Sequence, residues 1–367
     1  MTTAPARTRG PVRVVGVGLL GASVGIGLAS RGVDVVLADP SPSALALARD
    51  LGAGRLPAPD EAPPALVVVA APPDVTAEVV ALELATWPEA VVTDVASVKA
   101  GPLGKVAAAG ADVTRYVPGH PLAGRERSGA AAARGDLFVG RPWVLTGEAG
   151  PALEAVRDLV LSLGATPVLL DAEAHDEAVA LVSHVPQVAA SLVAARLRDA
   201  PASAVDLAGQ GLRDVTRIAA SDPGLWVQIL GANAGPVLSV LKALRADLDE
   251  VVAALEALAH DADGGAPGAR AALARTIAAG NDGYARIPGK HGSAPTAYAT
   301  VTVVVPDRPG QLGRLFSDMG EVGVNLEDLH LEHSPGQPVG LAELSVLPAA
   351  RERLETALRE RGWTVHG

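Results

Sequence analysis

His120 is the side chain of this 367-residue chain best suited to proton transfer. It stands in the polar segment 119–129, directly after a predicted strand. A histidine titrates near the working pH, so it can take a proton from a substrate hydroxyl while a hydride leaves the same or a conjugated centre. The position before Pro121 is equally suited to a turn residue. The glycine-rich turn described below predicts a dinucleotide cofactor close to His120, and this favours the interpretation of His120 as a general base.

A second polar segment follows the preceding predicted strand and contains Asp94, Ser97 and Lys99. Polar groups that follow parallel strands emerge at the carboxyl edge of the sheet, where open α/β sheets bind ligands. We therefore expect this segment and His120 to meet at one edge.

A third group of polar residues interrupts an apolar helix. His184, Gln187 and Ser191 are spaced i, i+3 and i+7, so they share one face. Pro186 is expected to free the carbonyl of Val182 and to bend the helix there. A pocket face and a hydrogen-bonded interior histidine are both consistent with this pattern.

Arg213 and Arg217 are predicted on one helical face at i, i+4, with Asp214 beside them. Two like charges at this spacing disfavour an isolated helix, so a shared anion is a reason for them to be there. The alternative is a solvated basic face.

A glycine-rich turn precedes these segments. Gly16, Gly18 and Gly21 follow an apolar strand, enclose Leu19 and Leu20, and open a helix. In this pattern the first glycine allows the turn, the second admits a pyrophosphate, and the third lets helix and strand pack closely. Asp39, at the end of the next strand, would accept hydrogen bonds from ribose hydroxyls and repel a 2′-phosphate. The motif predicts NAD rather than NADP; a βαβ unit without cofactor is the alternative.

Several site types are excluded. The chain has no cysteine, hence no disulfide or thiolate site. His330 and His333 are predicted at i, i+3 in a strand and would point to opposite faces, so no metal site is predicted. The remaining histidines are expected on loops or helix surfaces: His175, His260, His291 and His366.

The elements that must position these residues alternate between strand and helix over the first part of the chain. We predict an α/β fold with a Rossmann-type doubly wound sheet at residues 1–171 and an all-helical domain at 172–280, for which the family resemblance given below implies dimerisation. A linker at 281–296 and a βαββαβ domain at 297–367 complete the prediction. The expected strands are Val12–Val17, Val33–Ala38, Leu66–Ala70, Ala90–Asp94, Val113–Val117, Trp143–Thr146, Thr166–Leu170, Ala299–Val305, Val324–Glu332, Ala342–Leu347 and Trp363–His366.

Composition limits the functional classes. A net charge of −11 argues against general binding to nucleic acid or anionic membranes. The sequence shows no run of eighteen apolar residues and no cleavage pattern after its charged start, so we expect a soluble cytoplasmic protein.

Together these motifs resemble the prephenate/arogenate dehydrogenase family of tyrosine biosynthesis. The resemblance runs from Val12 to about Gly280, through the glycine turn, the segments around Ser97 and His120, Ser183–Gln187 and Gly211–Pro223. It implies an NAD-dependent homodimer that oxidatively decarboxylates prephenate to 4-hydroxyphenylpyruvate, with arogenate as the alternative substrate. Departures at Gln187, often histidine in the family, and Gln210, often glycine, leave the substrate preference open.

The resemblance also implies residue roles. His120 matches the catalytic histidine and Ser97 the serine that holds it, while Asp94 joins the cofactor-binding set. Arg217 matches the arginine that grips a substrate carboxylate. His184 matches a further pocket histidine, and the positions that frame the pocket entrance are matched by Glu126, Arg213 and Asp214. Gln187 departs from the family pattern and is expected to touch the substrate side chain.

Residues 299–367 resemble an ACT domain, a module that commonly binds amino acids at subunit interfaces. Asp307, Gly310 and Asn325 stand where a regulatory ligand would bind, with tyrosine as the candidate effector. The alternative is a dimerisation module without ligand.

Two other functions stay open. β-Hydroxyacid dehydrogenases and imine reductases share this domain plan, but usually rely on a lysine or aspartate in the helical domain. A non-catalytic amino-acid sensor with a relict Rossmann domain would not need Ser97, His120 and Arg217. NADH formation from prephenate discriminates between these functions.

Overall fold

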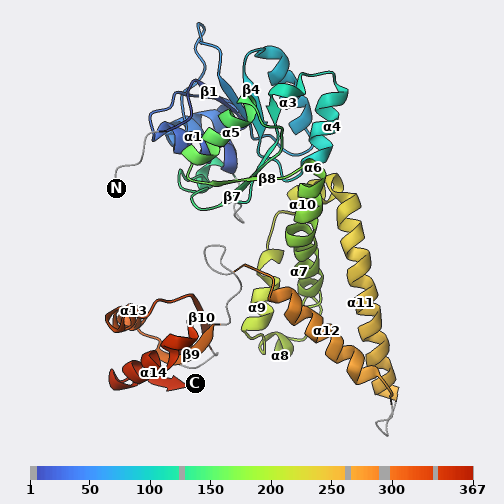
Figure 1. Cartoon of the computed structure of the whole chain (residues 1–367), viewed down its shortest axis with the longest axis vertical. Coiled ribbons are helices and arrows are strands. Elements are labelled where there is room, and N and C mark those ends of the chain that lie inside the picture. Colours follow the sequence, from blue (N-terminus) through green and yellow to red (C-terminus); the bar gives the residue numbers. More distant parts are fainter. Residues whose placement is uncertain (1–5, 124–128, 261–265, 289–297, 334–337, 367) are drawn as a thin grey trace. The chain divides into compact units, whose positions relative to one another are not determined.

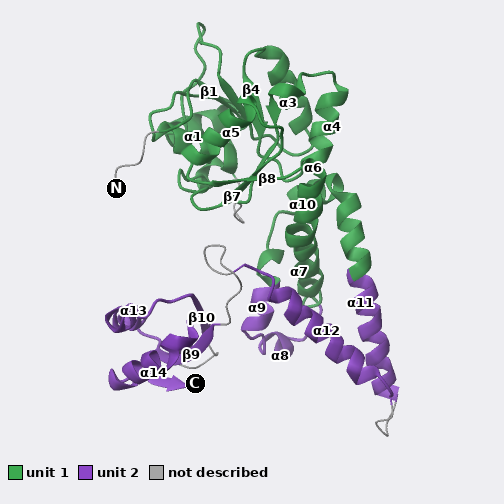
Figure 2. Cartoon of the chain, in the orientation of Figure 1, with its two compact units in different colours: residues 1–198, 216–243 green, residues 199–215, 244–367 purple. Residues whose placement is uncertain are grey.

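The computed structural model describes residues 6–123, 129–260, 266–288, 298–333 and 338–366 (Figure 1). The chain divides into two compact units, residues 1–198 with 216–243 and residues 199–215 with 244–367 (Figure 2). The boundaries at 171 and 280 stay predictions from the sequence.

A five-stranded parallel sheet forms the centre of the N-terminal region and confirms the Rossmann-type prediction. Its order is β2-β1-β3-β4-β5. Alternate residues of each strand face opposite sides, so Leu66 and Val68 belong to one apolar cluster and Val67 and Val69 to another. The elements are β1 Val12–Val15, α1 Leu19–Ala29, β2 Val35–Ala38, α2 Pro42–Asp50, β3 Leu66–Val69, α3 Thr76–Thr86, β4 Val91–Asp94, α4 Ala100–Ala108, η1 Val113–Arg115 and β5 Tyr116–Val117.

The strand predicted at 113–117 is mostly wrong. Only Tyr116 and Val117 pair with β4. Asp112 accepts hydrogen bonds from the backbone and the hydroxyl of Thr114, which favours a 3₁₀ turn over extended backbone.

The two later strands do not extend the parallel sheet. β7 (Pro142–Leu145) and β8 (Thr166–Leu169) form a separate sheet with β6 (Gly119–Pro121), in the order β6-β7-β8. β6 runs antiparallel to β7 and pairs His120 with Val144. His120 therefore lies in a short strand rather than in the loop that its sequence suggests. η2 (Ala130–Ala132) and α5 (Pro151–Ser162) complete this part.

A helical region follows and contains an irregular turn. The chain from Ala172 to Ala195 is helical throughout, but Ala180–His184 (η3) forms a π turn between α6 and α7. Pro186 stands two residues after the end of this turn, and the wider turn accommodates a residue without a backbone N–H. The helices are α6 Ala172–Val179, α7 Val185–Ala195, α8 Ala202–Val205, α9 Gln210–Thr216, η4 Arg217–Ala219, α10 Pro223–Ala232, α11 Ala234–His260 and α12 Ala269–Tyr284.

The stretch Ala172–Ala195 is by length and composition apolar enough to cross a membrane, with a mean hydropathy of 1.6. It nevertheless carries the buried polar residues His175, Asp176 and His184, each hydrogen-bonded to other elements. Buried and paired polar side chains of this kind are what an interior helix of a folded domain carries.

The C-terminal region confirms the predicted βαββαβ order. Its sheet has the order β10-β11-β9-β12, and alternate residues of β9 and β11 pack against two helices. The strands begin or end up to four residues from the predicted positions. The elements are β9 Ala299–Pro306, α13 Gln311–Val322, β10 Asp328–His333, β11 Val339–Val346, η6 Pro348–Ala350, α14 Arg351–Glu360 and β12 Thr364–His366.

Candidate active site

The glycine turn has the geometry that a dinucleotide requires. Gly16 has φ +93°, and a Cβ there would lie 2.4 Å from the carbonyl oxygen of Ala70. A Cβ on Gly21 would lie 1.9 Å from the carbonyl oxygen of Gly16. Gly18 precedes α1, is exposed, and has nothing within 4 Å of the corresponding position. The open space therefore lies at the helix N-terminus, where backbone N–H groups bind a pyrophosphate. Leu19 and Leu20 are half-buried in the first turn of α1.

Asp39 joins this turn to the next crossover. One carboxylate oxygen accepts a hydrogen bond from the backbone N–H of Val17 at 2.9 Å, and the other accepts one from Ser41 at 2.8 Å. Each oxygen keeps a second lone pair for a ribose hydroxyl. The role of Asp39 in cofactor binding stays a prediction.

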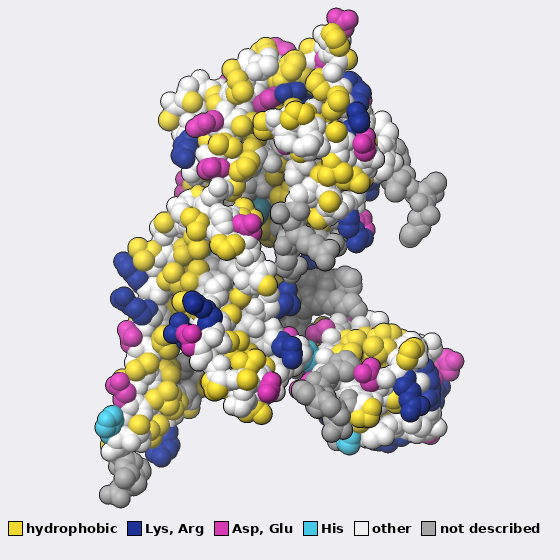
Figure 3. Space-filling view, turned by 180° about the vertical axis from the view of Figure 1, so that it is seen from behind, with side chains coloured by type: hydrophobic (Ala, Val, Ile, Leu, Met, Phe, Trp, Pro, Cys, Tyr) yellow, Lys and Arg dark blue, Asp and Glu magenta, His cyan; other side chains and the backbone are white. Residues whose placement is uncertain are grey.

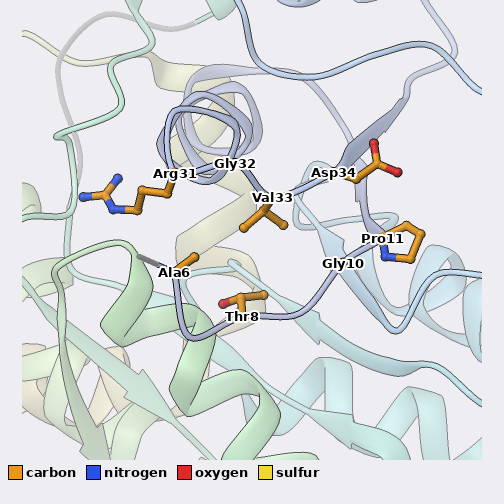
Figure 4. Close-up of a pocket in the computed structure, with 8 residues that line it drawn as sticks. All are labelled: Ala6, Thr8, Gly10, Pro11, Arg31, Gly32, Val33 and Asp34. Atoms are coloured by element: carbon orange, nitrogen blue, oxygen red, sulfur yellow. The ribbon is translucent and has the colours of Figure 1, made fainter. Parts of the chain in front are cut away.

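A surface pocket of about 440 Å³ lies at the other end of this sheet (Figure 4). It is lined by residues that precede β1 and β2, among them Thr8, Gly10, Arg31 and Asp34. Because open α/β sheets bind ligands at the carboxyl ends of their strands, this pocket is not the cofactor site.

A buried ion pair occupies the carboxyl end of β4. Asp94 and Lys99 are both fully buried, and the ammonium of Lys99 bonds the carboxylate of Asp94. Tyr116 donates to the same carboxylate at 2.7 Å. Lys99 also donates to the backbone carbonyl of Gly119, so the pair fixes the residue that precedes His120.

His120 lies at this edge and contacts a second histidine. Its Nδ1 lies 2.8 Å from Nε2 of His175, and the two rings are at 76° to each other. Nδ1 of His175 lies 2.8 Å from a carboxylate oxygen of Asp176. The expectation that His175 lies on a surface is wrong, because its side chain is completely buried.

Asp176 is held by the start of α4. Its carboxylate accepts hydrogen bonds from the backbone N–H of Lys99 at 2.8 Å and of Ala100 at 3.0 Å. A helix N-terminus stabilises such an anion. Burial alone would raise the pKa of Asp176, but hydrogen bonds from His175 and these N–H groups hold it below its ordinary value.

The pKa of His120 lies well below its ordinary value. Burial is the largest cause, and the positive charge of Lys99 and the neighbouring His175 and His184 lower it further. The imidazole is therefore neutral at pH 7, which is the state that a general base requires.

His184 occupies the end of the π turn. Its Nδ1 accepts a hydrogen bond of 3.0 Å from the amide of Asn233, which also donates to the backbone carbonyl of Asp176. Trp226 meets the His184 ring edge-on, with 6.0 Å between the centroids. Burial lowers the pKa of His184, so this ring is neutral as well. With Nδ1 accepting, Nε2 carries the proton and is a donor.

Gln187, about one turn after His184, is buried and its side chain forms hydrogen bonds with two serine hydroxyls. Its amide donates to the hydroxyl of Ser221 at 2.6 Å and to that of Ser191 at 3.4 Å. Ser221 in turn donates to the carbonyl of Ile218. Gln187 thus ties α7 to the turn that carries Arg217.

Arg213 and Arg217 lie in two different helical elements, and the shared face stays a prediction. α9 ends at Thr216, and Arg217 begins the 3₁₀ turn η4, where the 3.6-residue period no longer holds. Arg213, Asp214 and Arg217 are all exposed. Asp214 accepts a hydrogen bond from Gln210 one turn earlier on α9.

Ser97 and Glu126 are the two remaining residues that were predicted to lie in the site. Ser97 is half-buried, between β4 and Lys99, at the same edge as His120. Glu126 lies outside the described residues.

The residues predicted to bind a regulatory ligand are divided by the structure. Asp307 and Gly310 precede α13, whereas Asn325 follows it. The helix has twelve residues, about 18 Å at 1.5 Å per residue. A single small ligand in one copy of the domain cannot reach both ends.

His175 and Asp176 are the residues that sequence reasoning missed. A signal for them exists, because Ala172, His175, Asp176 and Val179 are spaced i, i+3, i+4 and i+7 and all four are buried. Two polar residues in phase with the apolar face of a helix must find partners inside.

The protein is an NAD-dependent oxidoreductase. This class is defined by three features at one edge of the sheet: the glycine turn, the neutral histidine and the buried ion pair. Family comparison agrees. The nucleotide-binding domain of prephenate dehydrogenase matches residues 25–169, and the dimerisation domain of prephenate dehydrogenase matches residues 171–264. The chain belongs to the prephenate dehydrogenase family.

Individual relatives support the same assignment. The chain is 41% identical over 355 residues to a probable prephenate dehydrogenase of Streptomyces niveus, covering 95% of this chain and 98% of that protein. The structure resembles A. aeolicus prephenate dehydrogenase in complex with hydroxyphenyl propionate and NAD⁺, at 25% identity and a TM-score of 0.63, covering 74% of this chain and 97% of that one. Synechocystis arogenate dehydrogenase is similar at 26% identity and a TM-score of 0.59, covering 74% and 99%.

Proposed function

We propose that this enzyme catalyses the NAD-dependent oxidative decarboxylation of prephenate to 4-hydroxyphenylpyruvate. The observation that carries the proposal is the neutral His120, fixed at the carboxyl edge of the sheet in a chain of this family. Arogenate, which differs from prephenate in its side chain, is the alternative substrate. Because the structure is similar to an arogenate dehydrogenase, the activity test below includes arogenate.

His120 acts as the base in this proposal. Its Nδ1 faces His175, so Nε2 is the ring nitrogen that takes the proton of the ring hydroxyl. Bound NAD supplies the acceptor for the hydride that leaves the ring carbon bearing this hydroxyl. Carbon dioxide departs from the opposite ring carbon, the ring becomes aromatic, and the proton held by His120 returns to the phenolic oxygen of the product. The residues therefore need mainly to align the ring and to hold one proton during the reaction.

The other predicted residues would orient the substrate. Arg217 offers a planar fork suited to a carboxylate, and Ser97 lies at the edge where the ring hydroxyl would bind. His184 lies near His120, because His184 is one of the groups that lower the pKa of His120. Its Nε2 is a hydrogen-bond donor available to the substrate. Gln187 acts through Ser221 on the Arg217 turn rather than by direct contact.

The test is NADH formation with purified enzyme, prephenate or arogenate, and NAD or NADP. We expect the highest kcat/KM for prephenate with NAD. A higher kcat/KM for arogenate would reverse the substrate assignment, and no turnover of either would contradict the proposed function.

A homodimer is proposed from the exposed apolar side chains of α11. Leu244, Leu248, Val252 and Leu255 form one stripe along this helix and are 43–57% exposed. The space-filling view shows apolar side chains gathered over the helical region (Figure 3). Leu248→Glu should convert the dimer to a monomer in sedimentation, whereas Leu82→Glu, on the exposed face of α3, should not. A monomeric wild-type chain would contradict the dimer.

Feedback control is proposed for the βαββαβ domain. Gly310 has φ +85° and precedes α13 with nothing within 4 Å of a Cβ position, so the free N–H groups there could bind the carboxylate of tyrosine. Asn325 would then contribute only from a second copy. Tyrosine should inhibit the full chain, and deletion of residues 296–367 should remove the inhibition.

A matched pair of variants locates this ligand site. Gly310→Asp charges the N-terminus of α13, whereas Gly323→Asp places the same residue at the opposite end, where φ is also positive and the space also open. Only the first should abolish inhibition. Equal inhibition of full-length and truncated enzyme would instead place tyrosine in the catalytic pocket.

A further inference from the structure

Three residues of unit 1 form one hydrogen-bonded chain that ends on His120. Asp176 contacts Nδ1 of His175, and Nε2 of His175 contacts Nδ1 of His120, each at 2.8 Å. His175 is completely buried, and the side chain of Asp176 is 6% exposed. Solvent therefore does not compete for the contact between His175 and Asp176, and the contact between His175 and His120 is partly buried.

The direction of each hydrogen bond follows from the charge on Asp176. Three donors point at its carboxylate, the N–H groups of Lys99 and Ala100 and the ring of His175, and its lowered pKa keeps it ionised. An ionised carboxylate only accepts, so Nδ1 of His175 carries the proton. In neutral His175 the other ring nitrogen, Nε2, then has a lone pair.

This lone pair fixes the tautomer of His120. Nδ1 of His120 must donate to His175, so its proton is on Nδ1 and the lone pair is on Nε2. Free imidazole side chains exchange between the two tautomers, and only one of them presents a base at Nε2.

We propose that His175 and Asp176 are positioning residues that hold His120 in the Nδ1–H tautomer, with Nε2 as the base for the substrate hydroxyl. The inference rests on the proposed role of His120. During the reaction Nε2 takes the substrate proton while the Nδ1–H bond to His175 stays in place. Asp176 also accepts hydrogen bonds from the backbone N–H groups of Lys99 and Ala100 at the start of α4. The same carboxylate therefore holds both α4 and, through His175, the base His120.

The tautomer is directly measurable without substrate. In the full-length enzyme labelled with ¹⁵N-histidine, the His120 resonances are assigned by their loss in His120→Asn, with His260→Asn as the exposed control. We expect a protonated Nδ1 and an unprotonated Nε2 at neutral pH. A protonated Nε2 on His120 would overturn the inference. It would not contradict the proposed reaction, which the measurement of NADH formation tests separately.

Two isosteric variants separate positioning from a purely structural role. His175→Gln keeps an acceptor at the distance of Nε2, facing His120, whereas His175→Asn keeps only the donor that faces Asp176. We expect kcat of the Asn variant to fall about 10- to 100-fold, the loss found when a partner that orients a metal-bound histidine is removed, with KM for NAD unchanged. The Gln variant should retain clearly more activity and the wild-type tautomer. Equal kcat values for the two variants would contradict the inference.

Discussion

The ammonium of Lys99 donates a hydrogen bond to the carbonyl of Gly119, the residue immediately before His120. The same ammonium is paired with Asp94 inside the protein, so the backbone at His120 is fixed independently of the imidazole. Substitution of the histidine side chain therefore tests chemistry rather than folding.

His120→Asn should fold normally and bind NAD, because the asparagine amide can replace Nδ1 as the donor to His175. Turnover should fall roughly 10²–10⁴-fold, the range for loss of a general base. The measurements are kcat and the Kd for NAD, with His260→Asn as the control. Turnover near the wild-type rate would remove His120 from the mechanism.

Arg217→Lys keeps the positive charge but loses the planar fork. If Arg217 grips a substrate carboxylate, KM for the substrate should rise more than kcat falls, since the interaction is made in both ground and transition states. Arg196→Lys, exposed at the end of α7, is the control. An unchanged KM for prephenate and arogenate would make Arg217 a surface charge.

The double variant Asp39→Ser with Pro40→Arg should shift preference toward NADP. It removes a carboxylate that repels a 2′-phosphate and adds a cation that binds it. Asp39→Asn, which keeps an acceptor for Val17, separates the charge from the loop contact. The ratio of kcat/KM for NADP and NAD is the measurement, and an unaltered ratio in the double variant would place specificity elsewhere.

Acid should destabilise the enzyme from about pH 6.5 downward. The folded-state pKa values of His120 and His184 are lowered, so between these values and about 6.5 the unfolded chain binds protons that the folded chain does not. Stability is then fully present above about pH 6.5 and is lost as the pH falls, by up to about 1.4 kcal/mol per pH unit for each histidine. His184→Gln should reduce the dependence of the unfolding free energy on pH. A slope unchanged by this substitution would contradict the assignment.

The sequence predicts the parts of this fold that depend on local period. The alternation of strand and helix is confirmed because it rests on residues close together in the chain. The glycine turn and Asp39 lie side by side for the same reason, and the contact of Asp39 with a cofactor stays a prediction. The strand at His120 is not predictable from local period, because it has only three residues and the pairing partner of His120, Val144, is distant in sequence. The contact between His120 and His175 joins positions 55 apart, and no local pattern encodes which two histidines meet.

The π turn at Ala180–His184 makes the length of this helix a functional parameter. Each residue in an α-helix advances the direction of the side chains by about 100°. A π turn closes over one residue more than an α turn, so the extra residue is taken up within the turn and the helices on either side keep nearly the same relative direction. In this arrangement Asn233 bonds both His184 and the Asp176 carbonyl. One further residue inserted between positions 180 and 184 would rotate His184 by about 100° relative to His175 and Asp176 and break this double contact.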